Sequence, residues 1–226
     1  MRNIQEITNI AIDKSCSTMS KALLAGLLIS IGGMFMLNVN SIGLINGFAF
    51  SLALISIVFT GANLFTGQCL YQQFHYQKYR QWKDNIWNLV FSWFGNLYGC
   101  ILTSIAFAFS LPSPQVKTFL ENIVLNKVNL PIFSMILRGI LCNILVCLAL
   151  FICLRAKDNI SKIAAIILCV SAFIACGFEH SIANMFFLTT GYLFSMISIF
   201  QELHNLLYVT IGNMIGAWIF YLFIKE

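Results

Sequence analysis

The 226-residue chain is 59% hydrophobic and only 9% charged, with a mean hydropathy of +0.85. Soluble domains carry about 25% charged residues, so these values exclude a soluble globular protein. A helical membrane span takes roughly 20 apolar residues, and the chain has room for six spans with short connections and no extramembrane domain.

The first 20 residues are predicted to form a cytoplasmic amphipathic segment, because Ile4, Ile7 and Ala11 recur at helical spacing among polar residues. A simple solvated lead-in is the alternative. Residues 21–226 form the membrane domain, in which six apolar segments are each expected to cross the bilayer as a helix. The segments cover about residues 22–37, 42–74, 86–111, 132–154, 163–191 and 206–224.

The formal net charge of +5 is concentrated in alternate connections between these segments. Ten of the 13 basic residues fall before the first span, after the second, around the start of the fifth or at the chain end. An excess of Lys and Arg in alternate connections marks the cytoplasmic side of a membrane protein. We therefore expect a multi-pass plasma-membrane protein with both termini in the cytoplasm, and no nucleic-acid partner.

The second and fifth segments carry polar residues and glycines in mid-course. GANLFTGQ interrupts the second at 61–68, and GFEHSIAN interrupts the fifth at 177–184. Irregular backbone at membrane depth is tolerated only where it is buried in protein or lines a cavity. Interrupted spans at corresponding places in two halves indicate a transport site. The structural residues assigned to the breaks are Gly61, Gly67, Gly177, Glu179 and Asn184.

The two halves of the membrane domain resemble each other. FGNLYG at 94–99 and IGNMIG at 211–216 are 117 residues apart, the two breaks are 116 residues apart, and LAGLL at 24–28 matches LRGIL at 137–141. Because three crossings reverse the direction of the chain, halves at about 21–111 and 131–226 would be inverted in the membrane. The predicted fold class is an all-α membrane protein with six transmembrane helices in an inverted 3+3 repeat and broken second and fifth helices.

Ionisable residues are scarce within the spans, so each of them is informative. Glu179 and His180 are the only adjacent ionisable pair expected deep in a span, where a charge is costly and a functional role is the default hypothesis. We expect His180 to face a transported solute, with a hydrogen-bonded structural histidine as the alternative. The Glu179 carboxylate is expected to accept hydrogen bonds from backbone N–H groups freed at the break. Thr66 would offer a hydroxyl from the other half.

The breaks also indicate the sign of the solute's charge. Helix N-termini at a break present positive dipole ends, and no ring of acidic side chains is available to attract cations. A small anion is therefore favoured. Because the chain has no nucleophile–base pair, phosphate loop or metal-ligand spacing, we predict no enzymatic activity, no cofactor and no metal. His75 and His204 lie near span ends and are expected at the membrane interface.

Four motifs together resemble the formate/nitrite transporter family. They are GANLFTG at 61–67, RGILCN at 138–143, GFEHSIANMF at 177–186 and TIGN at 210–213. The resemblance implies an aquaporin-like protomer with cytoplasmic termini, assembled as a homopentamer with one pore in each protomer. It also implies passage of small monovalent anions, among them formate, nitrite and hydrosulfide.

The resemblance implies roles for individual residues as well. The substrate-facing residues would be a central His180, Thr66 on the first break, Asn143 near the histidine and Lys127 at the outer entrance. An apolar constriction on the cytoplasmic side would consist of Leu54, Leu64 and Val146, and an outer one of Phe50, Phe65 and Phe173. Asn63 stands where many members of the family have an acidic residue.

Two dry constrictions favour the passage of a neutral species. Moving a bare charge into an apolar medium costs tens of kcal/mol, whereas protonating a carboxylate of pKa near 3.9 at pH 7 costs about 4 kcal/mol. We expect the anion to take up a proton near Thr66 and His180 and to cross as the neutral acid. In a rival account the anion stays charged and His180 is a transient cation.

The alternative functions are a hydrosulfide channel of the same family and a water or neutral-solute channel of related fold.

Overall fold

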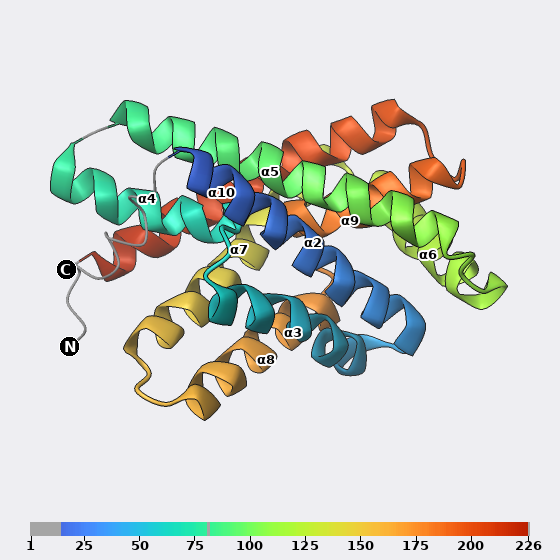
Figure 1. Cartoon of the computed structure of the whole chain (residues 1–226), viewed down its shortest axis with the longest axis horizontal. Coiled ribbons are helices and arrows are strands. Elements are labelled where there is room, and N and C mark those ends of the chain that lie inside the picture. The colour runs from blue at the N-terminus through green and yellow to red at the C-terminus, as the bar shows by residue number, and fades with distance from the viewer. Residues whose placement is uncertain (1–14, 81, 226) are drawn as a thin grey trace.

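The computed structural model describes residues 15–80 and 82–225, which form helices joined by short connections (Figure 1). Residues 1–14 of the predicted amphipathic segment lie outside the described residues, and the first described helix begins before the predicted boundary at residue 20. In chain order the helices are α2 (Ser15–Val39), α3 (Gly43–Thr60), α4 (Phe65–Tyr79), α5 (Trp82–Phe109), α6 (Pro114–Val128), α7 (Ile132–Arg155), α8 (Asn159–Ala175), α9 (Ser181–Leu193) and α10 (Ile199–Ile224).

Among the described residues, five helices are long and apolar enough to cross a membrane, namely α2, α3, α5, α7 and α10. Both predicted breaks are present. The second apolar segment divides into α3 and α4, and the fifth divides into the shorter apolar α8 and α9. In Figure 1, α3 and α8 lie beside each other below the long helices, so the two broken segments are neighbours in space.

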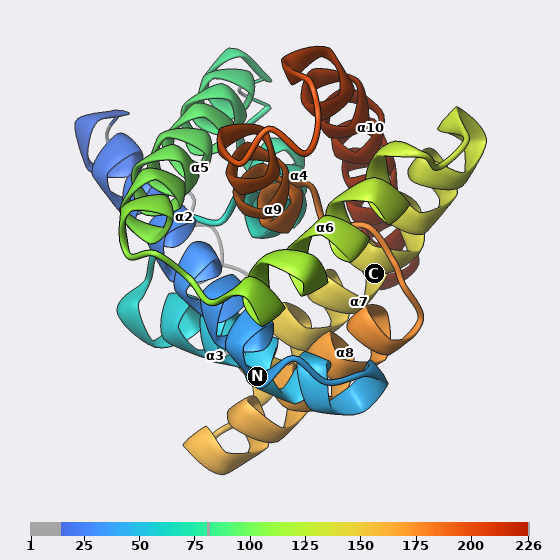
Figure 2. The ribbon, with the colours of Figure 1, turned by 90° about the vertical axis from the view of Figure 1, so that its right-hand side faces the viewer.

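Helix α6 was missed in the sequence, and it connects the two halves. Its N-terminus is well defined because the Ser113 side chain accepts a hydrogen bond from the backbone N–H of Val116 and Pro114 occupies the first turn. The helix lies across the end of the bundle that faces the viewer in Figure 2, in contact with α9, α10 and α2. Its mixed polar composition lacks the long apolar stretch by which the other helices were predicted.

The most extensive packing between helices is that of α2 with α5 and of α7 with α10, and both pairs depend on glycines (Figure 1). A Cβ atom added to Gly99 would lie 2.3 Å from the carbonyl oxygen of Leu23. One added to Gly212 would lie 2.4 Å from the carbonyl oxygen of Ile136. The GNxxG motifs therefore let two pairs of helix backbones approach closely, as small residues do in membrane proteins.

The asparagines of these motifs have a further structural role. Asn96 is fully buried, and its Nδ2 donates to the carbonyls of Ala22 and Asn63 at 2.7 and 2.9 Å. Its Oδ1 accepts from the backbone N–H of Phe65 at 2.9 Å. One side chain on α5 thus holds both sides of the first break against α2.

Asn213 makes the equivalent three hydrogen bonds in the second half. Its Nδ2 donates to the carbonyls of Gly139 and Glu179 at 2.8 and 2.9 Å, and its Oδ1 accepts from the N–H of Ser181 at 2.8 Å. These bonds pair Gly139 with Ala22, so the match of Gly139 with Gly26 made from the sequence is wrong by one helical turn. Small residues recur once per turn along a helix contact, so they match the two halves equally well at several offsets. The asparagine bonds distinguish between these offsets.

Candidate functional site

Each break begins at a glycine whose backbone is left-handed. Gly61 ends α3 with φ +69°, and its N–H donates to the carbonyl of Ile57. Gly177 follows α8 with φ +65°. Glycine adopts this conformation without the steric cost that a Cβ atom would impose. The chain can therefore leave one helix and start the next, α4 or α9, within a few residues.

Thr66 and His180 meet between the two breaks. The Thr66 Oγ1 and His180 Nε2 atoms are 2.9 Å apart, and both side chains are buried. His180 Nδ1 accepts a hydrogen bond from the backbone N–H of Ala183 and so caps α9. Since Nδ1 is an acceptor, the proton of the imidazole belongs on Nε2, and that N–H donates to Thr66 Oγ1. The Thr66 hydroxyl keeps its own proton to donate.

Asn143 lies beside this pair and connects the first break to α10. Its Nδ2 donates to the carbonyls of Thr66 and Asn213 at 3.3 and 2.7 Å. Both partners are carbonyls, so the orientation of the amide is determined by its surroundings. Its Oδ1 is buried and has no hydrogen-bond partner within the described part of the chain. A buried acceptor is thus available next to Thr66.

An aromatic layer covers His180 on one side. The Phe173 ring stacks on the imidazole with centroids 6.0 Å apart, and the Phe50 ring lies edge-on to Phe173 at 6.3 Å. Phe187 on α9 also contacts Phe50 and was missed in the sequence because it lies in an unbroken apolar run. Phe65 instead lines an apolar groove between α5 and α10, and its place in an outer constriction stays a prediction.

A cavity of about 540 Å³ reaches from α3 and α6 to the second break, and it is called the outer cavity after its side in the predicted topology. His180 and Phe173 form part of its lining, together with the charged side chains of Lys127, Arg138 and Glu179. The predicted substrate residues His180 and Lys127 therefore line one space.

Glu179 does not have the partners expected from the sequence. Its two carboxylate oxygens accept from Lys127 Nζ at 3.0 and 3.1 Å, and Oε2 also accepts from Asn184 Nδ2 at 2.6 Å. The expectation of backbone N–H donors is wrong because Asn213 takes the N–H of Ser181 and the His180 ring takes that of Ala183. The charge of Lys127 at this cavity is therefore compensated by Glu179.

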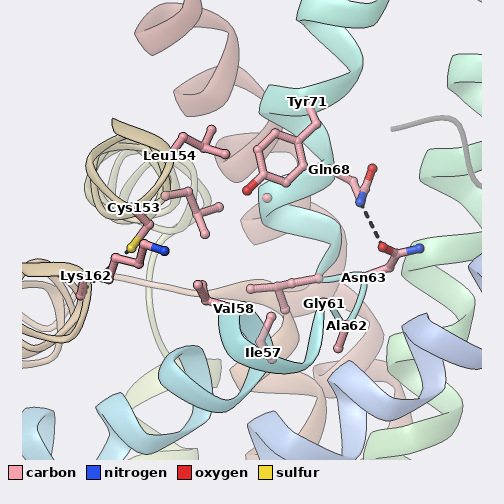
Figure 3. A pocket seen from close by; sticks show the side chains of 13 residues that line it. Ile57, Val58, Gly61, Ala62, Asn63, Gln68, Tyr71, Cys153, Leu154 and Lys162 are labelled. Carbon is pink, nitrogen blue, oxygen red and sulfur yellow. Dashed lines mark hydrogen bonds between the residues drawn. The ribbon is translucent and has the colours of Figure 1, made fainter. Parts of the chain in front are cut away.

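A second cavity of about 240 Å³ adjoins the first break (Figure 3), and it is called the inner cavity after its side in the predicted topology. Its lining includes Leu64 of the proposed inner constriction, whereas Leu54 and Val146 are buried among the helices. Gln68 Nε2 donates to Asn63 Oδ1 at 3.2 Å across its edge, as Figure 3 shows. This amide pair lies 116 residues before the Glu179–Asn184 pair of the second half.

His75 is buried in the protein, and its place at the membrane interface, expected from its position near a span end, stays a prediction. It is 4% exposed, and its Nδ1 is hydrogen-bonded to Asn85 Oδ1 on α5. Asn85 Nδ2 donates to the carbonyl of Gln72, and Gln72 Nε2 donates to Gln68 Oε1. A buried chain of polar groups thus follows α4 from the break. His204 is exposed near the start of α10.

A bundle of apolar helices with two facing breaks, each beside a cavity, has the architecture of a membrane transport protein. The chain belongs to the formate/nitrite transporter family, whose model matches residues 4–225. It is 32% identical to the nitrite transporter NirC of Escherichia coli over 183 residues, covering 78% of this chain and 68% of NirC. It is also similar in structure to an FNT family ion channel, with a TM-score of 0.87, 26% identity and coverage of 96% and 93% of the two chains. A pentameric formate channel with formate bound matches with a TM-score of 0.81, 27% identity and coverage of 94% and 98%.

Proposed function

We propose that this chain is a channel for small monovalent anions, with formate or nitrite as the physiological solute. The pore runs from the outer cavity past His180 and Thr66 to the inner cavity. The single observation that carries the proposal is the hydrogen bond between Thr66 and His180, because it joins the two breaks at a buried point. The names of the relatives, a nitrite transporter and a formate channel with formate bound, support the choice of solute.

The proposed topology is six membrane crossings in an inverted 3+3 repeat of aquaporin-like type, with α3–α4 and α8–α9 as the broken spans. The matching bonds of Asn96 and Asn213 support a repeat, and the placement of the basic residues supports plasma-membrane insertion with cytoplasmic termini. The pentameric state of the formate channel supports a homopentamer embedded in the lipid bilayer.

We infer that the anion crosses as its neutral acid. An imidazolium has no lone pair on Nδ1, so a charged His180 would lose the bond from the N–H of Ala183 and leave that buried N–H unpaired, at about 1–3 kcal/mol. A neutral His180 instead leaves the Thr66 hydroxyl to donate to the arriving anion. The anion takes up one proton that enters the cavity from the bulk solution at pH 7, so no hydroxide is left behind, and Asn143 Oδ1 is available to accept the O–H of the acid.

The test replaces His180 with Asn. Asparagine is a good N-cap residue and can accept the same backbone bond, so His180→Asn removes the imidazole while preserving the start of α9. We expect formate uptake into proteoliposomes to fall on the order of tenfold, as loss of about 1.4 kcal/mol of stabilisation would produce, and its pH dependence to change. His204→Asn, at an exposed position, is the matched control.

The same vesicles distinguish the solutes. Formate, nitrite and hydrosulfide uptake are measured side by side, together with osmotic swelling in glycerol. Unchanged flux and unchanged pH dependence in His180→Asn would overturn the mechanism. Swelling in glycerol without uptake of any of the three anions would overturn the anion channel in favour of a neutral-solute channel.

A further inference from the structure

The two cavities hold their charged groups differently. In the outer cavity Lys127 is paired with Glu179, and the second cation, Arg138, donates to the carbonyl of Gly177. The inner cavity is lined by 13 residues, of which Lys162 is the only Lys, Arg, Asp or Glu (Figure 3). The position equivalent to Glu179 is Asn63, 116 residues earlier, so the inner cavity has an uncharged amide where the outer one has a carboxylate.

Lys162 lies where helix stability does not favour a lysine. It is in the first turn of α8, which begins at Asn159, and a cation near a helix N-terminus is opposed by the helix dipole. Asp158, the nearest acid along the chain, is directed elsewhere. Its Oδ1 accepts from the N–H of Ser161 at 2.7 Å and its Oδ2 from the Ser161 hydroxyl at 2.8 Å.

These two bonds keep Asp158 occupied with the helix cap. The backbone N–H of Ser161, and then its hydroxyl, hold the pKa of the Asp158 carboxyl below its ordinary value. Within the described chain no ion pair joins Asp158 to Lys162. Among residues 15–80 and 82–225, the ammonium group of Lys162 therefore has no anionic partner, and its field acts on the inner cavity.

The other polar groups of this cavity suit an anion. In Figure 3, Lys162 and Cys153 lie on one side and the Gln68–Asn63 pair on the other, with Tyr71 between them. Gln68 uses its Nε2 to donate to Asn63 and has a second N–H on the same atom. The volume of about 240 Å³ exceeds the roughly 30 Å³ taken by a water molecule several-fold, so a small hydrated anion fits.

We propose that Lys162 is the anion-binding residue of the inner cavity and determines the charge selectivity of that end of the pore. Small anions with delocalised charge, such as formate or nitrite, are attracted by the ammonium group and receive hydrogen bonds from the neighbouring amide and hydroxyl groups. Cations are repelled. The inference rests on the proposed anion-channel function, because it assigns a binding residue to that same pore.

The test uses Cys153, which lines the same cavity, as a reporter of the local potential. The full chain in proteoliposomes is treated separately with an anionic and a cationic methanethiosulfonate reagent, and the rate of labelling at Cys153 is measured by peptide mass spectrometry. Lys162→Gln is expected to lower the anionic-to-cationic rate ratio about tenfold, equivalent to about 1.4 kcal/mol. Lys162→Arg keeps the charge and is expected to keep the ratio. Both reagents react with the thiolate form of Cys153. A change in the thiolate fraction therefore alters both rates by the same factor and leaves their ratio unchanged.

Three controls identify the signal. Cys153→Ser shows which peptide carries the reporter. Lys157→Gln removes a charge from the same connection at a position outside the cavity lining and is expected to leave the ratio unchanged. The exposed Cys176, next to the second break, serves as an internal reference with a ratio independent of Lys162.

Transport is measured in the same vesicles as an independent readout. Lys162→Gln is expected to raise the half-saturating formate or nitrite concentration on the inner side about threefold to tenfold, with maximal flux unchanged, as expected from loss of about 0.6–1.4 kcal/mol of binding. A labelling ratio that does not change in Lys162→Gln, or that falls equally in Lys157→Gln, overturns the inference. If Cys153 reacts with neither reagent, an unchanged half-saturating concentration overturns it.

The two proposals fail separately. If the unmodified chain carries no formate or nitrite but the labelling ratio still falls in Lys162→Gln, the anion channel is refuted and the inner anion site stands. If the anions are carried and neither readout responds to Lys162, the inner site alone is refuted.

Discussion

Lys127 and Glu179 are paired, but they are not equally buried, with side-chain exposures of 15% and 4%. Removing one partner of a buried pair leaves the other charge without compensation, at a cost of 3–5 kcal/mol in the most buried cases. The consequence differs between the two residues because a lysine left alone at the outer cavity can reach water, whereas Glu179 cannot.

We therefore expect Lys127→Met to destabilise the protein by about 3 kcal/mol and Glu179→Gln by only about 1 kcal/mol. The double variant is expected to lose less than the sum of the two, because residues in direct contact are coupled. Thermal unfolding in detergent, followed by tryptophan fluorescence, gives the unfolding temperatures of the two single variants and the double variant. Equal losses that add in the double variant would contradict a compensated pair.

At the scale of elements, Asn96 and Asn213 hold the two breaks in the same way, so they are expected to respond in the same way to mutation. Asn96→Ala and Asn213→Ala each leave buried backbone groups unpaired, at about 1–3 kcal/mol for each group. Both variants should unfold at much lower temperature than the unmodified chain, and Asn122→Ala, at an exposed position on α6, should not.

Transport is expected to depend on both asparagines. Asn213 holds Glu179 and Ser181 on either side of His180, so formate uptake per folded protein should fall in Asn213→Ala, by on the order of tenfold. A loss of flux is also expected for Asn96→Ala through Phe65, the neighbour of Thr66. Full uptake by either folded variant would show that the breaks keep their shape without these bonds.

The helices and breaks could be predicted from the sequence because they depend on local properties. A long apolar stretch, or a glycine followed by polar residues, is visible within 20 residues of chain. Helix α6 was missed because it is short and mixed in composition. The partners of Glu179 and the burial of His75 were missed because Lys127 is 52 residues away in sequence and α5 and α10 enclose a polar α4. Such contacts depend on tertiary packing.

At the scale of the whole molecule, the placement of charge predicts the orientation. The ends of α4, α7 and α10 and the start of α8 carry Lys78, Arg155, Lys225 and Lys162, and such residues mark the cytoplasmic side. A green fluorescent protein fused after Glu226 is expected to fluoresce in intact cells, and an alkaline phosphatase fused there should be inactive. The converse pattern would reverse the inner and outer cavities.

The matched asparagines also bear on how such a pore could have arisen. The framework is duplicated, yet the residues at its centre are not: Leu64 occupies the position equivalent to His180, and Ile182 the position equivalent to Thr66. Each half contributes one of the two polar groups and an aliphatic side chain in place of the other. A protein made from two copies of either half would keep the asparagine bonds but contain two histidines or two threonines. In a pore that arose by duplication of one half, the hydrogen bond between the breaks therefore requires later divergence, and neither half on its own encodes the site.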